Sequence, residues 1–273
     1  MPIADTHIHS MFSPDADRTE HNSIEAICKA AISKGIRYIT ITDHYDVDDV
    51  EGINSDINGI ETAILVAREQ FAKENLHLFF GLELAHANQY PEEEKKIREG
   101  HSFDFLFGSL HKITEKKDFF TMKYDQISDA ELKSMFENYL AELLTLANFF
   151  DFDSLAHCAY PLRYFVKHKR ETVIRLPDYY DAYAEIFKAL IANGKSLELN
   201  TSGLRQEFGM PFPPYSLIKL YFDLGGTLLT VGSDSHAAAT LGVGIDEVFE
   251  KIKQIGFRYI TVYENRKPLQ IKL

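Results

Sequence analysis

The sequence predicts an α/β fold in which parallel strands form a closed or nearly closed barrel, within a single domain spanning residues 1–273. Three observations support this fold class. Short β-rich segments alternate regularly with helical segments along the chain. Glycines follow several of the helical segments, as they do at helix ends. No Pro/Ser-rich spacer divides the chain. An open, doubly wound sheet is the alternative, but the GxGxxG and GxxxxGK[ST] phosphate loops often found in such sheets are absent.

Composition and charge narrow the function classes. The apolar content of 45%, with 20 Phe and 14 Tyr, is typical of a packed globular protein. A net charge of −12 argues against a nucleic-acid polymer as substrate, because an acidic surface repels phosphate backbones. The two cysteines, Cys28 and Cys158, indicate no disulfide framework. We find no signal-peptide pattern and no apolar run of about 20 residues, so we expect a cytoplasmic protein without membrane spans.

The elements follow one another in strand–helix order. Asn22 and Ser23 are suited to cap the first helix, and Gly35 to end it. Gly194, Gly225 and Gly256 end later helices. The predicted strands are residues 5–9, 36–42, 78–83, 103–110, 152–156, 196–199 and 227–231, with a final β-like segment at 257–263. The predicted helices are residues 24–34, 56–75, 91–99, 129–150, 178–193, 215–224 and 246–255, and residues 115–126 form a polar loop.

Side chains able to bind metals recur where the predicted strands end. His7 and His9 are two residues apart on a strand, so both imidazoles face the same side. The others are His44, Glu83, His111, His157, Asp234 and His236. A single histidine at a strand end is more often structural than a ligand, but six of the seven strand ends supply such a residue, and only the strand ending at Asn200 does not. Barrels of parallel strands place their active sites at this end.

These donors exceed what one metal needs, because a catalytic zinc site uses three protein ligands and a water. We therefore expect two or three divalent metals, with Glu83 as the central carboxylate that bridges them. Metals about 3.5–4 Å apart can share a hydroxide and clamp the oxygens of an anionic substrate. The remaining histidines lie in predicted loops or helices and are expected not to be ligands: His21, His77, His86, His101 and His168. Of these, His86 and His101 lie within a few residues of a strand end, so a ligand role stays open for them.

Six stretches together resemble the motifs of the polymerase-and-histidinol-phosphatase (PHP) superfamily. They are Asp5-Thr6-His7-Ile8-His9, Thr42-Asp43-His44, Gly81-Leu82-Glu83, Gly108-Ser109-Leu110-His111, His157 and Gly232-Ser233-Asp234-Ser235-His236. The resemblance implies a distorted (β/α)7 TIM-like barrel with a di- or trinuclear metal site. Residues 197–205, and His157 followed six residues later by Arg163, resemble the monofunctional histidinol-phosphatase branch.

The resemblance also implies a ligand set. One metal would be held by His7, His9, Glu83 and Asp234, and a second by Glu83, His111 and His157. A third would be held by His44, His236 and one further group. Many family members supply that group as a histidine, whereas this chain offers Asp15, which makes the site richer in oxygen. Zn, Mn or Fe are the expected ions.

The activity implied is hydrolysis of L-histidinol phosphate to L-histidinol and phosphate in histidine biosynthesis, by a hydroxide that bridges the metals. We expect Arg163 and Arg205 to grip the phosphoryl group bidentately. Asn200 and Ser202 are expected to contact substrate, and Asp15 or a third-site histidine to protonate the leaving alkoxide. A carboxylate of the acidic loop 115–125 would face the substrate ammonium.

Two alternatives stay open at this point. The first is a PHP enzyme for another small phosphorylated metabolite, such as a phosphotyrosine or a nucleotide. The second is a non-catalytic, metal-binding barrel that has kept the ligands.

Overall fold

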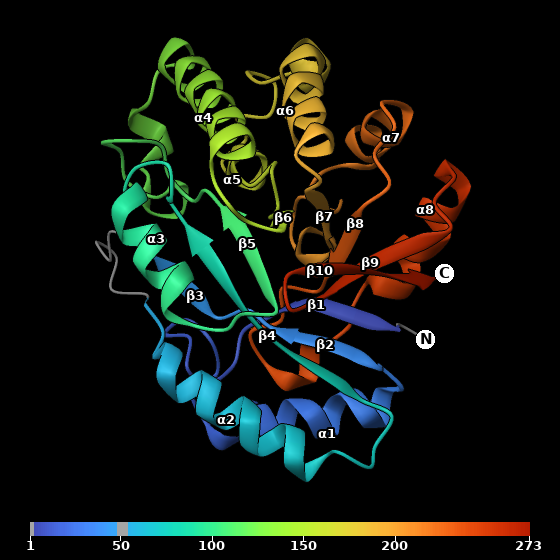
Figure 1. Ribbon diagram of the computed structural model, residues 1–273. Coiled ribbons are helices and arrows are strands. Elements are labelled where there is room, and N and C mark those ends of the chain that lie inside the picture. The colour runs from blue at the N-terminus through green and yellow to red at the C-terminus, as the bar shows by residue number, and fades with distance from the viewer. Residues whose placement is uncertain (1–2, 48–53) are drawn as a thin grey trace.

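The computed structural model describes residues 3–47 and 54–273, and its centre is one sheet of parallel strands (Figure 1). The strands are β1 (Ala4–Ile8), β2 (Tyr38–Ile41), β3 (His44–Asp46), β4 (His77–Ala85), β5 (Phe105–Ser109), β6 (Ser154–Leu155), β7 (Ser196–Asn200) and β8 (Leu229–Gly232). Their order in the sheet is β1-β2-β4-β5-β6-β7-β8. Strand β3 lies off this path and pairs with the C-terminal end of β4.

The first and last strands of this order meet. Ile8 and Ser235 form a parallel bridge, and the backbone N–H of His9 donates to the carbonyl oxygen of Ser235 at 2.8 Å. The Thr6 hydroxyl donates to the carbonyl oxygen of Val231 at 3.1 Å. These contacts nearly close the barrel, which confirms the predicted (β/α)7 barrel over the open sheet.

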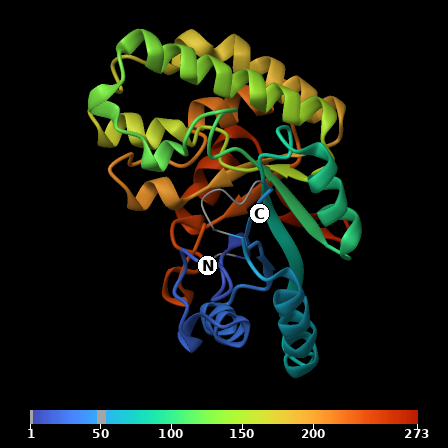
Figure 2. The same ribbon diagram turned by 90° about the vertical axis from the view of Figure 1, so that its left-hand side faces the viewer.

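Helices cover the outside of the barrel, and most of them bury an apolar face there. They are α1 (Ile24–Lys34), α2 (Ile57–Gln70), α3 (Pro91–Gly100), α4 (Asp129–Phe149), α5 (Pro161–Lys167), α6 (Tyr180–Ala192), α7 (Tyr215–Asp223) and α8 (Ile245–Ile255). In Figure 1, α1 and α2 lie below the sheet, and α4, α6 and α7 lie above it. Figure 2 shows α4 and α6 side by side.

The predicted caps of α1 are present. The Ser23 hydroxyl accepts a hydrogen bond from the backbone N–H of Ala26 at 3.2 Å. Gly35 ends the helix in the left-handed conformation, with φ 71°.

Both cysteines are buried and form no disulfide. Within residues 3–47 and 54–273, no helix combines the length and apolar character that crossing a membrane requires.

Three elements were not predicted. β3 begins only two residues after β2 ends, so the sequence there reads as one strand and its loop. Helix α5 has seven residues, too few for a periodic pattern, and starts with Pro161 in its first turn. Strand β10 (Lys267–Lys272) pairs antiparallel with β9 (Tyr259–Glu264), but it is mostly exposed and contains Pro268, which made it hard to predict.

One predicted strand is shorter than expected. Residues 152–156 contain only the two-residue strand β6. The Asp153 backbone N–H donates to the carbonyl oxygen of Leu106 at 2.9 Å, and its carboxylate accepts from the backbone N–H of Leu106 at 2.8 Å, so a side chain takes part in the pairing just before β6.

Candidate metal centre and substrate cavity

Glu83 is the centre of the site. It projects from β4 into the barrel and is fully buried. Its Oε2 atom lies 3.1 Å from His7 Nε2 and 3.1 Å from His44 Nδ1. Its Oε1 atom lies 3.0 Å from His111 Nε2 and 2.7 Å from His157 Nε2. Imidazoles thus face both oxygens of one carboxylate, which is the arrangement that a bridging carboxylate requires.

Asp234 joins this group from the loop after β8. Its Oδ1 atom lies 3.2 Å from His9 Nε2 and 3.8 Å from His7 Nε2. Its backbone has a φ of 53°, a left-handed conformation that aspartate adopts more readily than most residues. The first and last strands of the barrel therefore contribute to one set of candidate metal-binding side chains. We call this set the ligand group: His7, His9, Asp15, His44, Glu83, His111, His157, Asp234 and His236.

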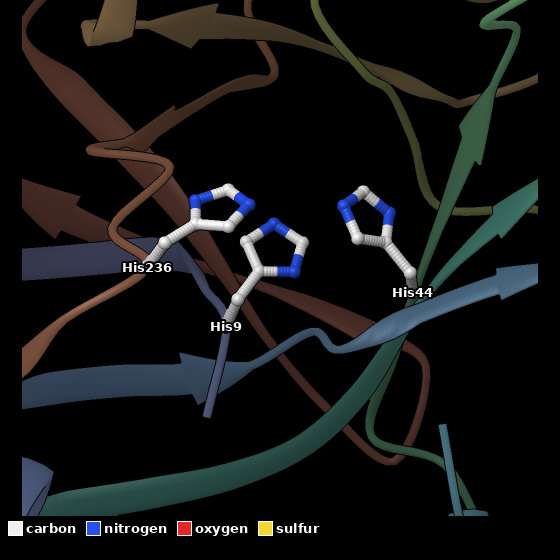
Figure 3. A group of neighbouring side chains, drawn as sticks. All are labelled: His9, His44 and His236. Carbon is white, nitrogen blue, oxygen red and sulfur yellow. The ribbon is translucent and has the colours of Figure 1, made fainter. Parts of the chain in front are cut away.

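Asp15 lies between two histidines at the outer edge of the group. Its Oδ2 atom is 3.0 Å from His236 Nε2 and 3.3 Å from His44 Nε2. Figure 3 shows His9 between His44 and His236, with ring centroids 4.2 Å from each. Burial opposes ionisation of Asp15, but hydrogen bonds from His236 and His44 more than offset it and hold the pKa of Asp15 below its usual range.

The donor set suits divalent transition metals. Among the described residues, His9 Nε2 and His44 Nδ1 are buried polar atoms without a hydrogen bond, and each faces a carboxylate oxygen. Burial, reinforced by His236 and His44, lowers the pKa of His9 to about 3, so its imidazole is neutral and its lone pair available. Imidazole nitrogens combined with carboxylate oxygens fit zinc, manganese or iron. The residues present therefore fit two or three such ions.

Two buried aspartates hold the loops that carry the ligands. Asp5 accepts hydrogen bonds from the backbone N–H of Ser233, at 2.8 Å, and from its hydroxyl, at 2.5 Å. Asp43 accepts from the backbone N–H of Ser10 at 2.6 Å and from the Ser13 hydroxyl at 2.8 Å. These bonds fix the chain next to His9 and next to Asp234.

Glu198, on β7, was not among the predicted site residues. Its Oε1 atom lies 2.7 Å from His7 Nδ1, and its Oε2 atom accepts from the backbone N–H of His157 at 2.7 Å. A carboxylate on the far nitrogen of a metal-binding histidine fixes the ring and its tautomer. A Cβ atom at Gly232 would collide with His7 and Glu198, so a glycine is required there. The signal available in the sequence was a carboxylate between two leucines, in a strand that is buried throughout.

A cavity of about 360 Å³ opens over the ligand group. Arg163 lines it, and its guanidinium lies 4.8 Å from the ring centre of Tyr164 and 5.1 Å from that of Tyr160. Asp118 lines the same cavity; its Oδ1 atom accepts from the Tyr160 hydroxyl at 3.1 Å and the Phe120 backbone N–H at 2.6 Å. One cavity therefore combines the acid–imidazole group, a cation and a carboxylate.

The other predicted substrate residues bond to the protein itself. The Arg205 guanidinium donates to the carbonyl oxygens of Ser233, at 2.8 Å, and Asp234, at 3.3 Å. The Asn200 amide oxygen accepts from the Ser202 hydroxyl at 2.7 Å, and its Nδ2 donates to Asp234 at 3.3 Å. Of the two arginines, only Arg163 is among the described residues that line the cavity. A phosphate contact by Arg205, Asn200 or Ser202 stays a prediction.

Comparisons with known proteins agree with this geometry. The model of the PHP domain family matches residues 5–202. A probable histidinol-phosphatase from Thermotoga maritima is 29% identical over 99% of this chain and 100% of its own length. A histidinol-phosphatase from Lactococcus lactis is 26% identical over 98% of this chain and 96% of its own length. Both matches therefore extend well beyond the family motifs.

Solved structures show the same fold. The histidinol phosphate phosphatase (HisK) of Lactococcus lactis, complexed with zinc, L-histidinol and phosphate, superposes with a TM-score of 0.80 at 24% identity, covering 97% of this chain and 98% of that one. A putative histidinol phosphatase from Listeria monocytogenes gives a TM-score of 0.78 at 17% identity, covering 89% of this chain and 99% of that one.

We predict that Glu198→Gln weakens metal binding by about 10- to 100-fold, because an amide holds the His7 ring and its tautomer less firmly than a carboxylate. Titration of the metal-free protein with zinc, in competition with a chromophoric chelator, measures this. Glu250→Gln, an exposed change on α8, is the control and should leave affinity unchanged. Equal affinities for the two variants would contradict the role assigned to Glu198.

We also predict that metal binding at about pH 8 releases protons. Burial alone would lower the pKa of His111, but Glu83 and Asp46 outweigh it and raise this pKa to about 10. His111 is therefore protonated in the metal-free protein and must lose a proton to become a ligand, so metal affinity should rise with pH up to about 10. Calorimetry in buffers of different ionisation enthalpy measures the release; heats independent of the buffer would refute it.

Proposed function

Because the chain belongs to the PHP domain family, we propose that it is a metal-dependent phosphatase that hydrolyses L-histidinol phosphate to L-histidinol and phosphate in histidine biosynthesis. The two curated relatives that match nearly the full chain are named as enzymes of this activity. The observation that carries the proposal is the single cavity lined by the ligand group, Arg163 and Asp118. The metals of the ligand group and the Arg163 cation would complement a phosphate ester, and the Asp118 carboxylate would complement an ammonium group on the same substrate.

The metals and the chain have separate tasks in this proposal. Two or three divalent ions, held by the ligand group around Glu83, would supply Lewis acidity toward the phosphoryl oxygens and a nucleophile at neutral pH. Arg163 would bind the phosphoryl group, since a guanidinium pairs bidentately with phosphate oxygens. Its cation–π contacts with Tyr160 and Tyr164 restrain the side chain before substrate arrives.

The leaving alkoxide needs a proton, and the outer edge of the site offers two groups that share one. Asp15 and His236 lie 3.0 Å apart and both line the cavity. With two metals bound and no ion at the outer position, we propose that this pair delivers the proton to the leaving oxygen. A third ion held by Asp15 and His236 would occupy both groups as ligands instead.

Asp118 would recognise the substrate ammonium. Its position is fixed by a chain of hydrogen bonds, because the Tyr164 hydroxyl donates to the Tyr160 hydroxyl at 2.9 Å, and that hydroxyl donates to Asp118. Burial raises the pKa of Tyr164 to about 12, so its hydroxyl keeps its proton at neutral pH. The aromatic rings of Tyr160 and Tyr164 would provide an apolar wall for the substrate imidazole.

Cytoplasmic action as a single domain over residues 1–273 completes the proposal. Two buried, unpaired cysteines are compatible with a reducing compartment. The acidic net charge of −12 favours small phosphorylated metabolites over nucleic-acid polymers.

We expect the metal-loaded protein to release phosphate from histidinol phosphate faster than from phosphotyrosine or nucleoside monophosphates. Chelation should abolish the activity, and added zinc or manganese should restore it. Arg163→Lys should lower kcat/KM by about 10- to 100-fold, because lysine cannot pair bidentately with phosphate. Arg175→Lys, at an exposed position, is the matched control. Full activity after chelation, or a preference for another phosphomonoester, would contradict the proposal.

Asp118→Asn should selectively impair substrates that have an ammonium group. We expect kcat/KM for histidinol phosphate to fall by about tenfold or more, because a charge-assisted hydrogen bond becomes a neutral one. For the analogue that lacks the amine, kcat/KM should stay near that of the unmodified protein. Asp125→Asn, an exposed change in the same loop, is the control. Equal losses on both substrates would assign Asp118 a structural role.

A further inference from the structure

Two further buried side chains, Asp46 and His86, lie behind His111 and have no part in the mechanism above. Asp46 is on β3, and its Oδ1 atom lies 3.6 Å from His111 Nδ1. Its Oδ2 atom lies 3.6 Å from His86 Nδ1. All three side chains are buried, and neither Asp46 oxygen has a hydrogen bond within the described part of the chain. A buried carboxylate is costly unless donors face it, so this arrangement requires an explanation.

Two chemistries could explain the group: a further metal ion, or protons on the two histidine nitrogens. One hydrogen bond decides between them. The backbone N–H of His111 donates to His86 Nε2 at 3.2 Å, so this nitrogen bears no proton. In a neutral imidazole the proton is then on Nδ1. A protonated nitrogen has no lone pair for a metal, so His86 Nδ1–H faces Asp46 as a donor.

Turning the His86 ring over would place carbon atoms where its two nitrogens now face Asp46 and the backbone N–H of His111. The residue follows directly after β4 with a φ of 63°, and its backbone N–H donates to the carbonyl oxygen of Ser109 at 3.2 Å, which fixes the backbone from which the ring projects. His86 therefore directs one proton at one oxygen of Asp46. The other oxygen lies 3.6 Å from His111 Nδ1, just beyond hydrogen-bond distance, and is the acceptor that remains for a proton on that nitrogen.

We propose that Asp46 and His86 form a tautomer lock, which keeps the proton of His111 on Nδ1 and its Nε2 lone pair directed at the metal centre. His111 Nε2 lies 3.0 Å from Glu83 Oε1, as a ligand of the same metal requires. The lock rests on the proposed function only in that His111 binds metal. Asp46 and His86 are positioning residues, because they act through His111.

The lock gives Asp46→Asn a specific defect. An asparagine offers one acceptor and one donor, and Nδ1–H of His86 would take the acceptor. The amide N–H would then face His111 Nδ1 and place the histidine proton on Nε2, the wrong tautomer for a ligand. His86→Gln removes the competing donor but keeps an acceptor for the His111 N–H. Adding it to Asp46→Asn should let the asparagine turn and restore the ligand.

The test uses the full chain in four forms: unmodified, Asp46→Asn, His86→Gln and the double variant. Elemental analysis measures the zinc bound per chain, and competition with a chelator measures zinc affinity. Asp46→Asn should weaken one bound zinc by about 10- to 100-fold. His86→Gln alone should stay close to the unmodified protein, and the double variant should recover most of the loss. Asp153→Asn, a buried aspartate before β6, is the control for a structural effect.

Undiminished zinc affinity of Asp46→Asn would overturn the lock, as would a double variant no better than Asp46→Asn. Nitrogen-15 NMR of the zinc-loaded unmodified protein tests it without substitution: we expect both His86 and His111 to be protonated at Nδ1, and a proton on Nε2 of either would refute it. None of these measurements uses a substrate, so failure of the lock and failure of the proposed phosphatase activity are distinguishable.

Discussion

The structure depends on a single buried carboxylate. Glu83 lies inside the barrel with its two oxygens facing four imidazoles, and no amount of apolar packing around it would compensate for its charge. Burial alone would raise the pKa of Glu83, yet the surrounding histidines hold it well below its usual range. The strand pairing serves this contact: Glu83 is in register with His44 on β3 and with Phe107 on β5, so the neighbouring strand ends deliver their histidines to its two sides.

A second layer of acids stands behind the imidazoles. Glu198 bonds to His7, Asp46 faces His111, and Asp5 and Asp43 hold the loops on either side of the barrel seam. Glu198 also accepts from the backbone N–H of His157, and none of these four acids is among the residues that line the substrate cavity. They therefore position the candidate metal ligands and leave the contacts with substrate to other side chains.

The ligand group was predictable because it follows a rule of parallel barrels: residues after successive strands meet at one rim, whatever their separation in sequence. The same rule says nothing about side chains that point inward before the strand ends, such as Glu198, or about Asp46 on a strand too short to recognise. His86 looked like a loop histidine because its role depends on a left-handed backbone and a hydrogen bond to His111, neither of which has a sequence signature. The motif around Arg205 predicted that this arginine binds the phosphoryl group. In the structure its guanidinium donates to the backbone carbonyl oxygens of Ser233 and Asp234.

The seam between β1 and β8 has a consequence for biosynthesis. His9 and Asp234 approach within 3.2 Å, but the ribosome makes them at opposite ends of the chain. At 5–20 residues per second, roughly 10 to 45 s pass between the appearance of one and the other. Throughout that interval the nascent polypeptide exposes an incomplete set of donors able to trap stray cations. The full set of donors therefore exists only once β8 and the loop after it have been made, and a chain truncated before β8 would lack both Asp234 and His236.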